Sequence, residues 1–231
     1  VGSEMCIRDS HYSADEKSNV PLKEGKLFMT DTGGHYLEGS TDITRTVALG
    51  EVGNIEKEHF TLVARAMLRL ANTVFLYGCS GANLDCIARE VFWKEGLNFN
   101  HGTGHGVGYL LNIHEGPINF RWKEGERPAP ALEENMVITD EPGIYIEGSH
   151  GIRLENELLV RKTVKNEYGQ FMNFEILTYV PIDLDAILPE KMNTEEKEML
   201  NHYHKQVYEK VSPYLSEEER IWLKEYTRAV K

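Results

Sequence analysis

The chain has 231 residues, of which 41% are hydrophobic, so it is long enough for one large domain with a core of its own. Its formal net charge of −12 argues against nucleic acid or an anionic membrane surface as a partner, and no apolar run approaches the roughly 20 residues needed to cross a bilayer. Cys6, Cys79 and Cys86 are too few and too irregularly spaced for a disulfide framework, which favours a cytoplasmic protein.

Two carboxylates fall in a segment with the pattern of a β-hairpin. Asp31 follows the apolar run 27–29 and precedes two glycines, and Asp42 opens the β-branched run 43–47. Adjacent strands would bring the two carboxylates together. Taken singly, an aspartate beside a glycine is more often a turn former than a ligand, because its side chain can hydrogen-bond its own backbone.

Two helices are expected next. Apolar residues recur on one side of a helical pattern that starts at Asn54 and ends near Gly78, and a second helical pattern covers residues 83–95. Residues 119–134 contain two prolines among charges and are predicted to form a surface loop. Helices outside and ligand-bearing strands inside make an α+β arrangement.

A second pair of carboxylates repeats the arrangement of the first. The run 137–139 leads to Glu141, and Glu155 lies within the run 152–160, so a second hairpin is predicted to point both carboxylates inward. A glutamate inside an otherwise apolar strand would be costly to bury without a cation or a donor. The run 171–182 is predicted to be the last strand.

The chain changes character after Pro181. Residues 194–211 and 216–229 have helical patterns, and Ser216 to Glu219 form a capping box at the start of the second helix. These two helices carry many of the aromatic residues of this part of the chain.

Four of these carboxylates and one histidine together form the donor set of a site for two metal ions. The set is Asp31, Asp42, His105, Glu141 and Glu155. Carboxylate oxygens with one imidazole suit Mn²⁺, Zn²⁺ or Co²⁺, and the excess of oxygen donors favours Mn²⁺ over a thiolate-type zinc site.

The alternating glycines of residues 101–108 could suggest nucleotide binding, but their spacing is wrong for it. A dinucleotide site needs G-x-G-x-x-G between a strand and a helix, and a phosphate loop needs a terminal Gly-Lys-Ser/Thr. Small residues around His101 and His105 would instead let the backbone and the imidazoles approach a metal ion and a substrate closely.

Five short sequence motifs of the chain resemble those of the pita-bread metallopeptidases and, within them, of the aminopeptidase P family. The motifs occur in the same order as in the family and with compatible spacing. They are Asp31-Thr32-Gly33 with Thr41-Asp42-Ile43-Thr44-Arg45-Thr46, His101-Gly102-Thr103-Gly104-His105-Gly106-Val107-Gly108, His114-Glu115-Gly116-Pro117, Glu141-Pro142-Gly143-Ile144-Tyr145, and Gly151-Ile152-Arg153-Leu154-Glu155-Asn156. The resemblance implies the α+β pita-bread fold. It also implies a metalloexopeptidase that hydrolyses the bond between an N-terminal residue and a following proline, using a water activated by two metal ions.

The resemblance assigns a role to each matching residue. The metal ligands are Asp31 on one ion, Asp42 and Glu155 bridging both, and His105 and Glu141 on the other. The mechanism expected of a metal-activated water makes Glu141 the candidate proton shuttle and His114 the candidate donor to the oxyanion, and His101 is expected to be catalytic with them. The substrate-binding residues are His11, His101, His114 and Arg153. Arg153 shares a strand face with Glu155 and would hold a metal-bound carboxylate in place; a solvent-facing arginine is the alternative.

The expected organisation has three parts. Residues 1–10 lack the apolar core of a signal peptide and are expected to be a foreign leader. Residues 11–181 are expected to form the catalytic domain, incomplete at its amino end. Residues 182–231 resemble the helical extension of the long cytosolic aminopeptidase P type, where it packs near a dimer contact, and a cap with no partner role is the alternative.

Two other functions remain open at this stage. Prolidase, an Xaa-Pro dipeptidase, has the same ligand set, and a non-catalytic binding module could share the fold. The helical extension and the amino-acid sequence of residues 101–108 favour the aminopeptidase. A relative that only binds is expected to lose metal ligands, and each ligand of the set is present in the sequence.

Overall fold

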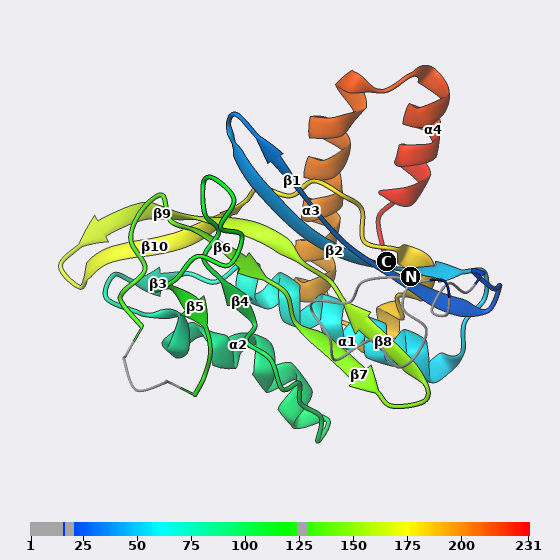
Figure 1. Ribbon diagram of the computed structural model, residues 1–231, viewed down its shortest axis with the longest axis horizontal. Helices are drawn as coiled ribbons and strands as arrows, with labels where there is room; N and C mark the ends of the chain where they lie inside the picture. The colour runs from blue at the N-terminus through cyan, green and yellow to red at the C-terminus, as the bar shows by residue number, and fades with distance from the viewer. Residues whose placement is uncertain (1–15, 17–20, 124–128) are drawn as a thin grey trace.

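The computed structural model describes residues 16, 21–123 and 129–231, which form an α+β arrangement (Figure 1). Helices α1 (Asn54–Ala71) and α2 (Gly81–Lys94) pack on each other and against the strands. Helices α3 (Thr194–Val211) and α4 (Glu217–Tyr226) stand side by side at the edge of the molecule. Among the described residues, no helix combines the length and the apolarity needed to span a bilayer.

The first hairpin places the two aspartates on one face. Strands β1 (Lys26–Tyr36) and β2 (Gly39–Leu49) pair antiparallel, with Asp31 opposite Thr44 and Gly33 opposite Asp42. Asp42 and Thr44 are two residues apart and therefore point to the same side of β2. The two aspartates are thus diagonal neighbours on this face. The hairpin predicted from the sequence is confirmed.

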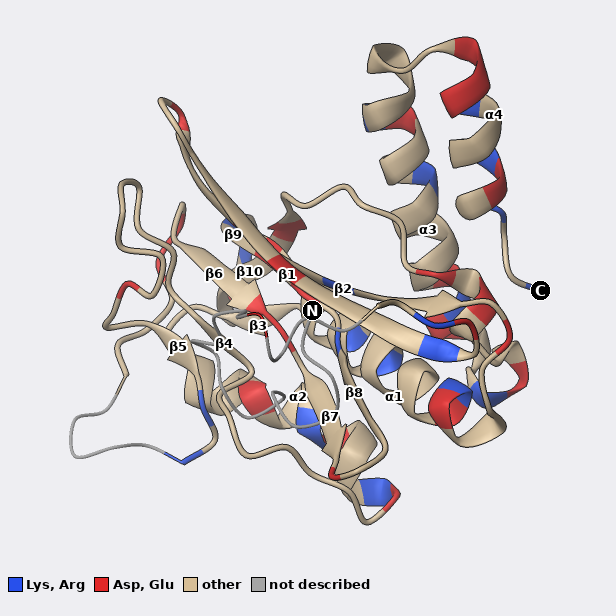
Figure 2. Cartoon of the chain, turned by 45° about the vertical axis from the view of Figure 1, so that its right-hand side comes forward, with Lys and Arg blue, Asp and Glu red and all other residues tan. Residues whose placement is uncertain are grey.

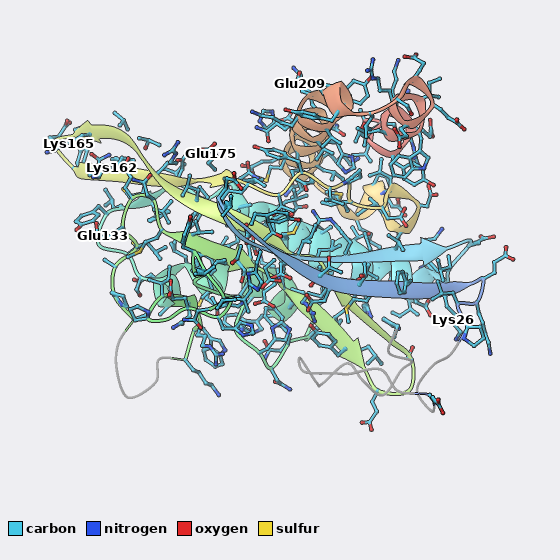
Figure 3. All side chains as sticks on the ribbon, turned by 45° about the horizontal axis from the view of Figure 1, so that its top comes forward. Lys26, Glu133, Lys162, Lys165, Glu175 and Glu209 are labelled. Carbon is cyan, nitrogen blue, oxygen red and sulfur yellow. The ribbon has the colours of Figure 1, made fainter. Side chains whose placement is uncertain are left out.

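The other strands form one four-stranded antiparallel sheet, in the order β3-β10-β9-β6, and two short pairs, β4-β5 and β7-β8. Their bounds are β3 Phe75–Leu76, β4 Gly104–His105, β5 Asn119–Phe120, β6 Val137–Asp140, β7 Gly143–Ile146, β8 His150–Arg153, β9 Asn156–Asn166 and β10 Gly169–Ile176. The first half of β9 is buried and its second half is exposed. The exposed half projects from the molecule with β10, and Figure 3 labels Lys162 and Lys165 on this ribbon.

The second predicted hairpin is built differently from the expectation. Glu141 lies in the link from β6 to β7, and Glu155 lies in the link from β8 to β9. Pro142 cannot donate to a strand ladder, so it interrupts the run after Glu141. The backbone N–H of Glu155 donates to the carbonyl of Thr44 on β2 at 3.0 Å, which takes this residue out of the β7-β8 pair.

Three further segments differ from the sequence prediction. The first helix ends at Ala71, ahead of the predicted end near Gly78, because residues 75–76 pair with β10 as strand β3. The predicted last strand 171–182 already ends at Ile176. Residues 119–120 of the predicted loop pair with β4.

Helix α1 is the centre of the core. Its apolar face, including Phe60, Val63, Met67 and Leu68, is fully buried. Each such side chain stabilises the fold by roughly 1.5–3 kcal/mol relative to an exposed one. The helix packs on α2, α3 and β8, so the core joins the strands to the C-terminal helices.

The last helix, α4, begins at the cap expected from the sequence. The Ser216 hydroxyl accepts from the backbone N–H of Glu219, whose carboxylate accepts from the N–H of Ser216 at 2.8 Å, so the predicted capping box is confirmed. Three consecutive glutamates colour the first turn of α4 red in Figure 2, where negative charge is favourable beside the helix N-terminus. Glu196 on α3 is buried and pairs with Arg65 on α1 at 2.9 Å.

His204 lies inside the contact between α3 and the domain. Its Nε2 accepts from the backbone N–H of Ile182 at 3.1 Å. Burial, together with the positive charge of Arg45, lowers the pKa of this imidazole to about 4 from its ordinary value of 6.5. The unfolded chain therefore binds the proton more readily than the folded protein between pH 6.5 and 4, and acid favours unfolding across this window.

We expect His204→Gln to flatten the pH dependence of stability. Glutamine keeps an acceptor for Ile182 but does not titrate, so the variant should avoid a loss of about 3 kcal/mol that His204 causes in the native chain between pH 6.5 and 4. Urea unfolding at several pH values measures this. The matched control is His202→Gln, at an exposed position on the same helix, which should keep the native slope. Equal slopes in both variants would contradict the assignment.

Candidate metal centre

Three of the expected ligands converge from three segments of the chain. Asp42 on β2, His105 on β4 and Glu155 after β8 each offer a ligand atom, and these atoms all lie within 4.8 Å of one another. The His105 Nε2 atom is 3.6 Å from Asp42 Oδ2 and 3.5 Å from Glu141 Oε1. The structure therefore brings these four side chains to one place.

Asp31, the fifth expected ligand, lies beside this group. Its side chain is 46% exposed and forms an ion pair with the guanidinium of Arg153. Its negative charge contributes to the raised pKa of Asp42, after burial. Asp31 thus belongs to the same electrostatic cluster as the other four.

The electrostatics of the cluster fit a bound cation. Burial raises the pKa of Glu141 to about 7, with the neighbouring carboxyl of Asp42 adding to this rise and the guanidinium of Arg153 opposing it. Burial raises the pKa of Glu155 well above its usual range, with added repulsion from Glu141 and Asp42. Buried carboxylates this close cannot all ionise without positive charge between them. The oxygen and imidazole donors fit a divalent ion of the Mn²⁺ or Zn²⁺ type.

Two threonine hydroxyls orient the carboxylates. Thr44 donates to Glu155 Oε2 at 2.7 Å, and Thr139 lies 3.2 Å from Glu141 Oε1. Thr139 also accepts from the backbone N–H of His105 at 3.0 Å. The sequence reasoning missed both residues. Thr44 lies two residues after Asp42 on β2, and Thr139 lies two residues before Glu141 at the end of β6, so the strand period of two applied to the predicted strands could have found them.

Arg153 lies against the acidic cluster, where the sequence reasoning expected it. Besides Asp31, its guanidinium is 4.0 Å from Glu141 Oε2 and donates to the hydroxyl of Thr44 at 3.1 Å. It also donates to the Tyr145 hydroxyl at 3.1 Å. The sequence reasoning did not single out Tyr145, whose ring extends this network toward His101.

Two of the three expected substrate-site histidines lie within this region, and His11 is outside the described residues. The rings of His105 and His114 meet edge to face, with centroids 4.1 Å apart. His101 lies between the rings of Phe99 and Tyr145. Burial lowers the pKa of His101 to about 4, so its imidazole is neutral at pH 7.

The glycines of this segment are required by close backbone approach. A Cβ at Gly104 would lie 1.8 Å from the Thr139 carbonyl oxygen, and one at Gly106 would lie 2.2 Å from the carbonyl oxygen of Glu115. Such distances are shorter than any side chain tolerates. The small residues here are therefore required by backbone packing, and their role in close approach to a metal ion and a substrate stays a prediction.

Helix α2 holds the histidine segment from outside. The buried guanidinium of Arg89 donates to the carbonyl oxygens of Phe99 at 2.8 Å and His101 at 2.6 Å. Asp85 pairs with Arg89 at 2.6 Å and accepts from the Thr103 hydroxyl. One buried ion pair therefore fixes the backbone on both sides of His101.

A pocket of about 480 Å³ opens beside the cluster. Its lining includes Glu38 to Ser40, Gly106 to Tyr109, Glu115 to Ile118 and Glu157. Glu157 joins the pocket to the site because its carboxylate accepts from the backbone N–H of Asp42 at 2.9 Å. The pocket and the metal centre are therefore connected through the backbone of strand β2 at Asp42.

We expect Asp85→Asn to destabilise the protein by about 3–5 kcal/mol, because it leaves the buried charge of Arg89 without its partner. Glu90→Gln on the same helix is the control. The Glu90 side chain is 45% exposed and pairs with Lys94 and Arg69, so its loss should cost less than about 1 kcal/mol. Unfolding in urea measures both values, and a loss at Asp85 as small as that at Glu90 would refute the ion-pair argument.

Comparison with known sequences supplies the family. A model of metallopeptidase family M24 matches residues 4–162, and one of the C-terminal region of peptidase M24 matches residues 170–230. Probable Xaa-Pro aminopeptidase P of Paracoccidioides brasiliensis is 40% identical over 225 residues, which are 95% of this chain and 36% of the relative. Aminopeptidase P1 of Arabidopsis thaliana is 38% identical over 233 residues, covering 100% of this chain and 36% of that protein.

Solved structures agree with the sequence relatives. X-prolyl aminopeptidase from Caenorhabditis elegans, described as a cytosolic enzyme with a di-nuclear active site, matches 95% of this chain with 36% identity and a TM-score of 0.88, over 36% of its own length. Prolidase from Pyrococcus furiosus matches 75% of this chain and 46% of its own, with 32% identity and a TM-score of 0.60. This chain thus spans about a third of the length of its aminopeptidase relatives. It belongs to metallopeptidase family M24 and has the pita-bread fold of that family.

Proposed function

We propose that this chain is the metal-binding catalytic part of an Xaa-Pro aminopeptidase, which removes an N-terminal residue that precedes proline. The convergence of Asp42, His105 and Glu155 carries the proposal, because it provides the donors that a metallopeptidase needs. The similarity to the X-prolyl aminopeptidase of Caenorhabditis elegans over 95% of the chain supports it. The proposed substrates are peptides with proline at the second position.

The C-terminal region favours the aminopeptidase over prolidase. The match to the prolidase of Pyrococcus furiosus covers 75% of the chain, whereas the match to the Caenorhabditis elegans enzyme covers 95% with a higher TM-score. The C-terminal family region spans residues 170–230. A non-catalytic binding module is disfavoured because the sequence contains each residue of the proposed donor set, and the ligand atoms of Asp42, His105 and Glu155 lie within 4.8 Å of one another.

Five residues would hold two divalent cations. Asp31 would bind one ion, His105 and Glu141 the other, and Asp42 and Glu155 both. Because four of the five donors are carboxylates, we propose Mn²⁺, with Zn²⁺ or Co²⁺ as alternatives. When bound, such ions act as Lewis acids and lower the pKa of a bound water toward neutrality.

The protein side chains would then move protons and position the peptide. Glu141, steadied by Thr139, would take the proton of the attacking water and deliver it to the proline nitrogen as the peptide bond breaks. His114 would donate a hydrogen bond to the tetrahedral oxyanion. The neutral imidazole of His101 would line the site beside Tyr145, and Arg153 would keep Asp31 oriented.

Cellular setting and assembly complete the proposal. Cys79 and Cys86 are free thiols, which suits the reducing cytoplasm, and the similar enzyme from Caenorhabditis elegans is described as cytosolic. Ile221 and Trp222 on α4 are 65% and 53% exposed, and this apolar face is a candidate surface for a homodimer. Neither nucleic acid nor a membrane surface is proposed as a partner, given the charge of −12.

Metal titration tests the donor assignment. The native chain should bind about two equivalents of Mn²⁺, and Asp42→Ala or Glu155→Ala should remove both, because a bridging carboxylate serves two ions. His105→Ala should mainly weaken one. His35→Ala, on the exposed tip of the first hairpin, is the control and should leave binding unchanged. The bridging assignment fails if Asp42→Ala still binds two ions with native affinity.

Cleavage of Xaa-Pro-Xaa peptides but not Xaa-Pro dipeptides would separate aminopeptidase from prolidase.

His114→Ala should keep both metal ions and lower kcat on the order of 10²-fold, because the oxyanion loses a donor. The measurement is peptide hydrolysis at saturating Mn²⁺, with metal content determined on the same sample. If His114 only shapes its turn, the variant will instead melt earlier and retain nearly full activity per folded molecule.

A further inference from the structure

Arg45 is a buried cation next to the metal centre. It lies on β2, three residues after Asp42, and is 5% exposed. Among the described residues its guanidinium donates to neutral oxygens. These acceptors are the carbonyls of Thr44, Glu155 and Val180, the Asn156 Oδ1 atom and the Tyr203 hydroxyl. A guanidinium stays charged at any ordinary pH, so its position in the interior depends on these acceptors.

One end of Arg45 fixes the proposed bridging ligand Glu155. Nη1 of Arg45 lies 2.5 Å from the carbonyl oxygen of Glu155. The neighbouring Thr44 accepts from the backbone N–H of Glu155 at 3.0 Å and donates to its carboxylate at 2.7 Å. Two adjacent residues of β2 therefore hold the amide, the carbonyl and the carboxylate of one ligand, in a link where Glu155 leaves the strand ladder.

The other end of Arg45 contacts helix α3. Nη2 donates to the Tyr203 hydroxyl at 2.8 Å, and that hydroxyl donates onward to the carbonyl of Val180 at 2.7 Å. Tyr203 lies on α3 and is 1% exposed. It is 158 residues away from Arg45 in the chain. Without this hydroxyl, Nη2 would lose an acceptor in a place that water does not reach.

We propose that Tyr203 is a positioning residue for the metal centre, acting through Arg45 on Glu155. The C-terminal region would then be part of the support of the site as well as a cover for α1. The inference rests on the proposed role of Glu155 as a metal ligand. Residues that orient ligands from behind typically change metal affinity 10–100-fold when they are altered.

The test is Mn²⁺ affinity by calorimetry on the full chain, at a temperature where every variant is folded. Tyr203→Phe removes only the hydroxyl and should weaken Mn²⁺ binding about tenfold. Tyr208→Phe is the matched control, since Tyr208 lies on the same helix with its ring packed against the core, and its affinity should equal that of the native chain. A purely structural role would lower the melting temperature of the metal-free protein and leave Mn²⁺ affinity unchanged.

A double-variant cycle with Arg45→Lys shows whether Tyr203 acts through Arg45. The doubly substituted protein should bind Mn²⁺ no more weakly than Arg45→Lys alone, whereas independent effects would multiply. If Arg45→Lys does not fold, Tyr203→Phe decides alone. Native affinity in Tyr203→Phe overturns the inference. Absence of Mn²⁺ binding by the native chain would instead overturn the proposed function, so the two failures are distinct.

Discussion

The main constraint on this structure is the electrostatic repulsion between carboxylates that lie close together in a largely buried site. Burial raises the pKa of Asp42, Glu141 and Glu155. The charge of Asp31 adds to the effect on Asp42, that of Asp42 to the effect on Glu141, and those of Glu141 and Asp42 to the effect on Glu155, so several acidic groups share a site with little access to water. Arg153 offsets part of this charge from one side. The remaining charge is the physical reason why the site suits divalent cations, and it explains why so much of the surrounding fold serves to hold these groups still.

Two buried arginines fix the backbone of residues at the metal centre in the same way. Arg89 on α2 binds the carbonyl of His101, and Arg45 on β2 binds the carbonyl of Glu155. Both site residues lie in irregular backbone, where no strand ladder fixes the carbonyl. A planar guanidinium with several fixed donors can bridge such a carbonyl to a rigid helix. The two pairs differ in charge balance, because Arg89 has the carboxylate of Asp85, whereas Arg45 is held by neutral oxygens among the described residues.

The C-terminal helices are relevant both to the support of the metal centre and to the distinction between aminopeptidase and prolidase. They fall within a separately recognised C-terminal region, and the match to the prolidase of Pyrococcus furiosus covers less of the chain than that to the Caenorhabditis elegans aminopeptidase. Helix α3 contacts α1 through the pair of Arg65 and Glu196, and contacts the site strands through Tyr203. Helix α3, at the edge of the fold, therefore contacts strand β2, which carries the proposed ligand Asp42.

The sequence alone determined the first hairpin, the presence of the first two helices with the start of the first at Asn54, and the capping box at Ser216, because periodicity and caps are local properties. It also singled out the donor residues, through their chemical type and the resemblance of their motifs to a family. Only the tertiary structure decided that Glu141 and Glu155 lie in links between strands, that Tyr145 contacts Arg153 and that Tyr203 contacts Arg45. The last of these contacts joins segments far apart in the chain, and a hydrogen bond across 158 residues leaves no trace in a local pattern of side chains.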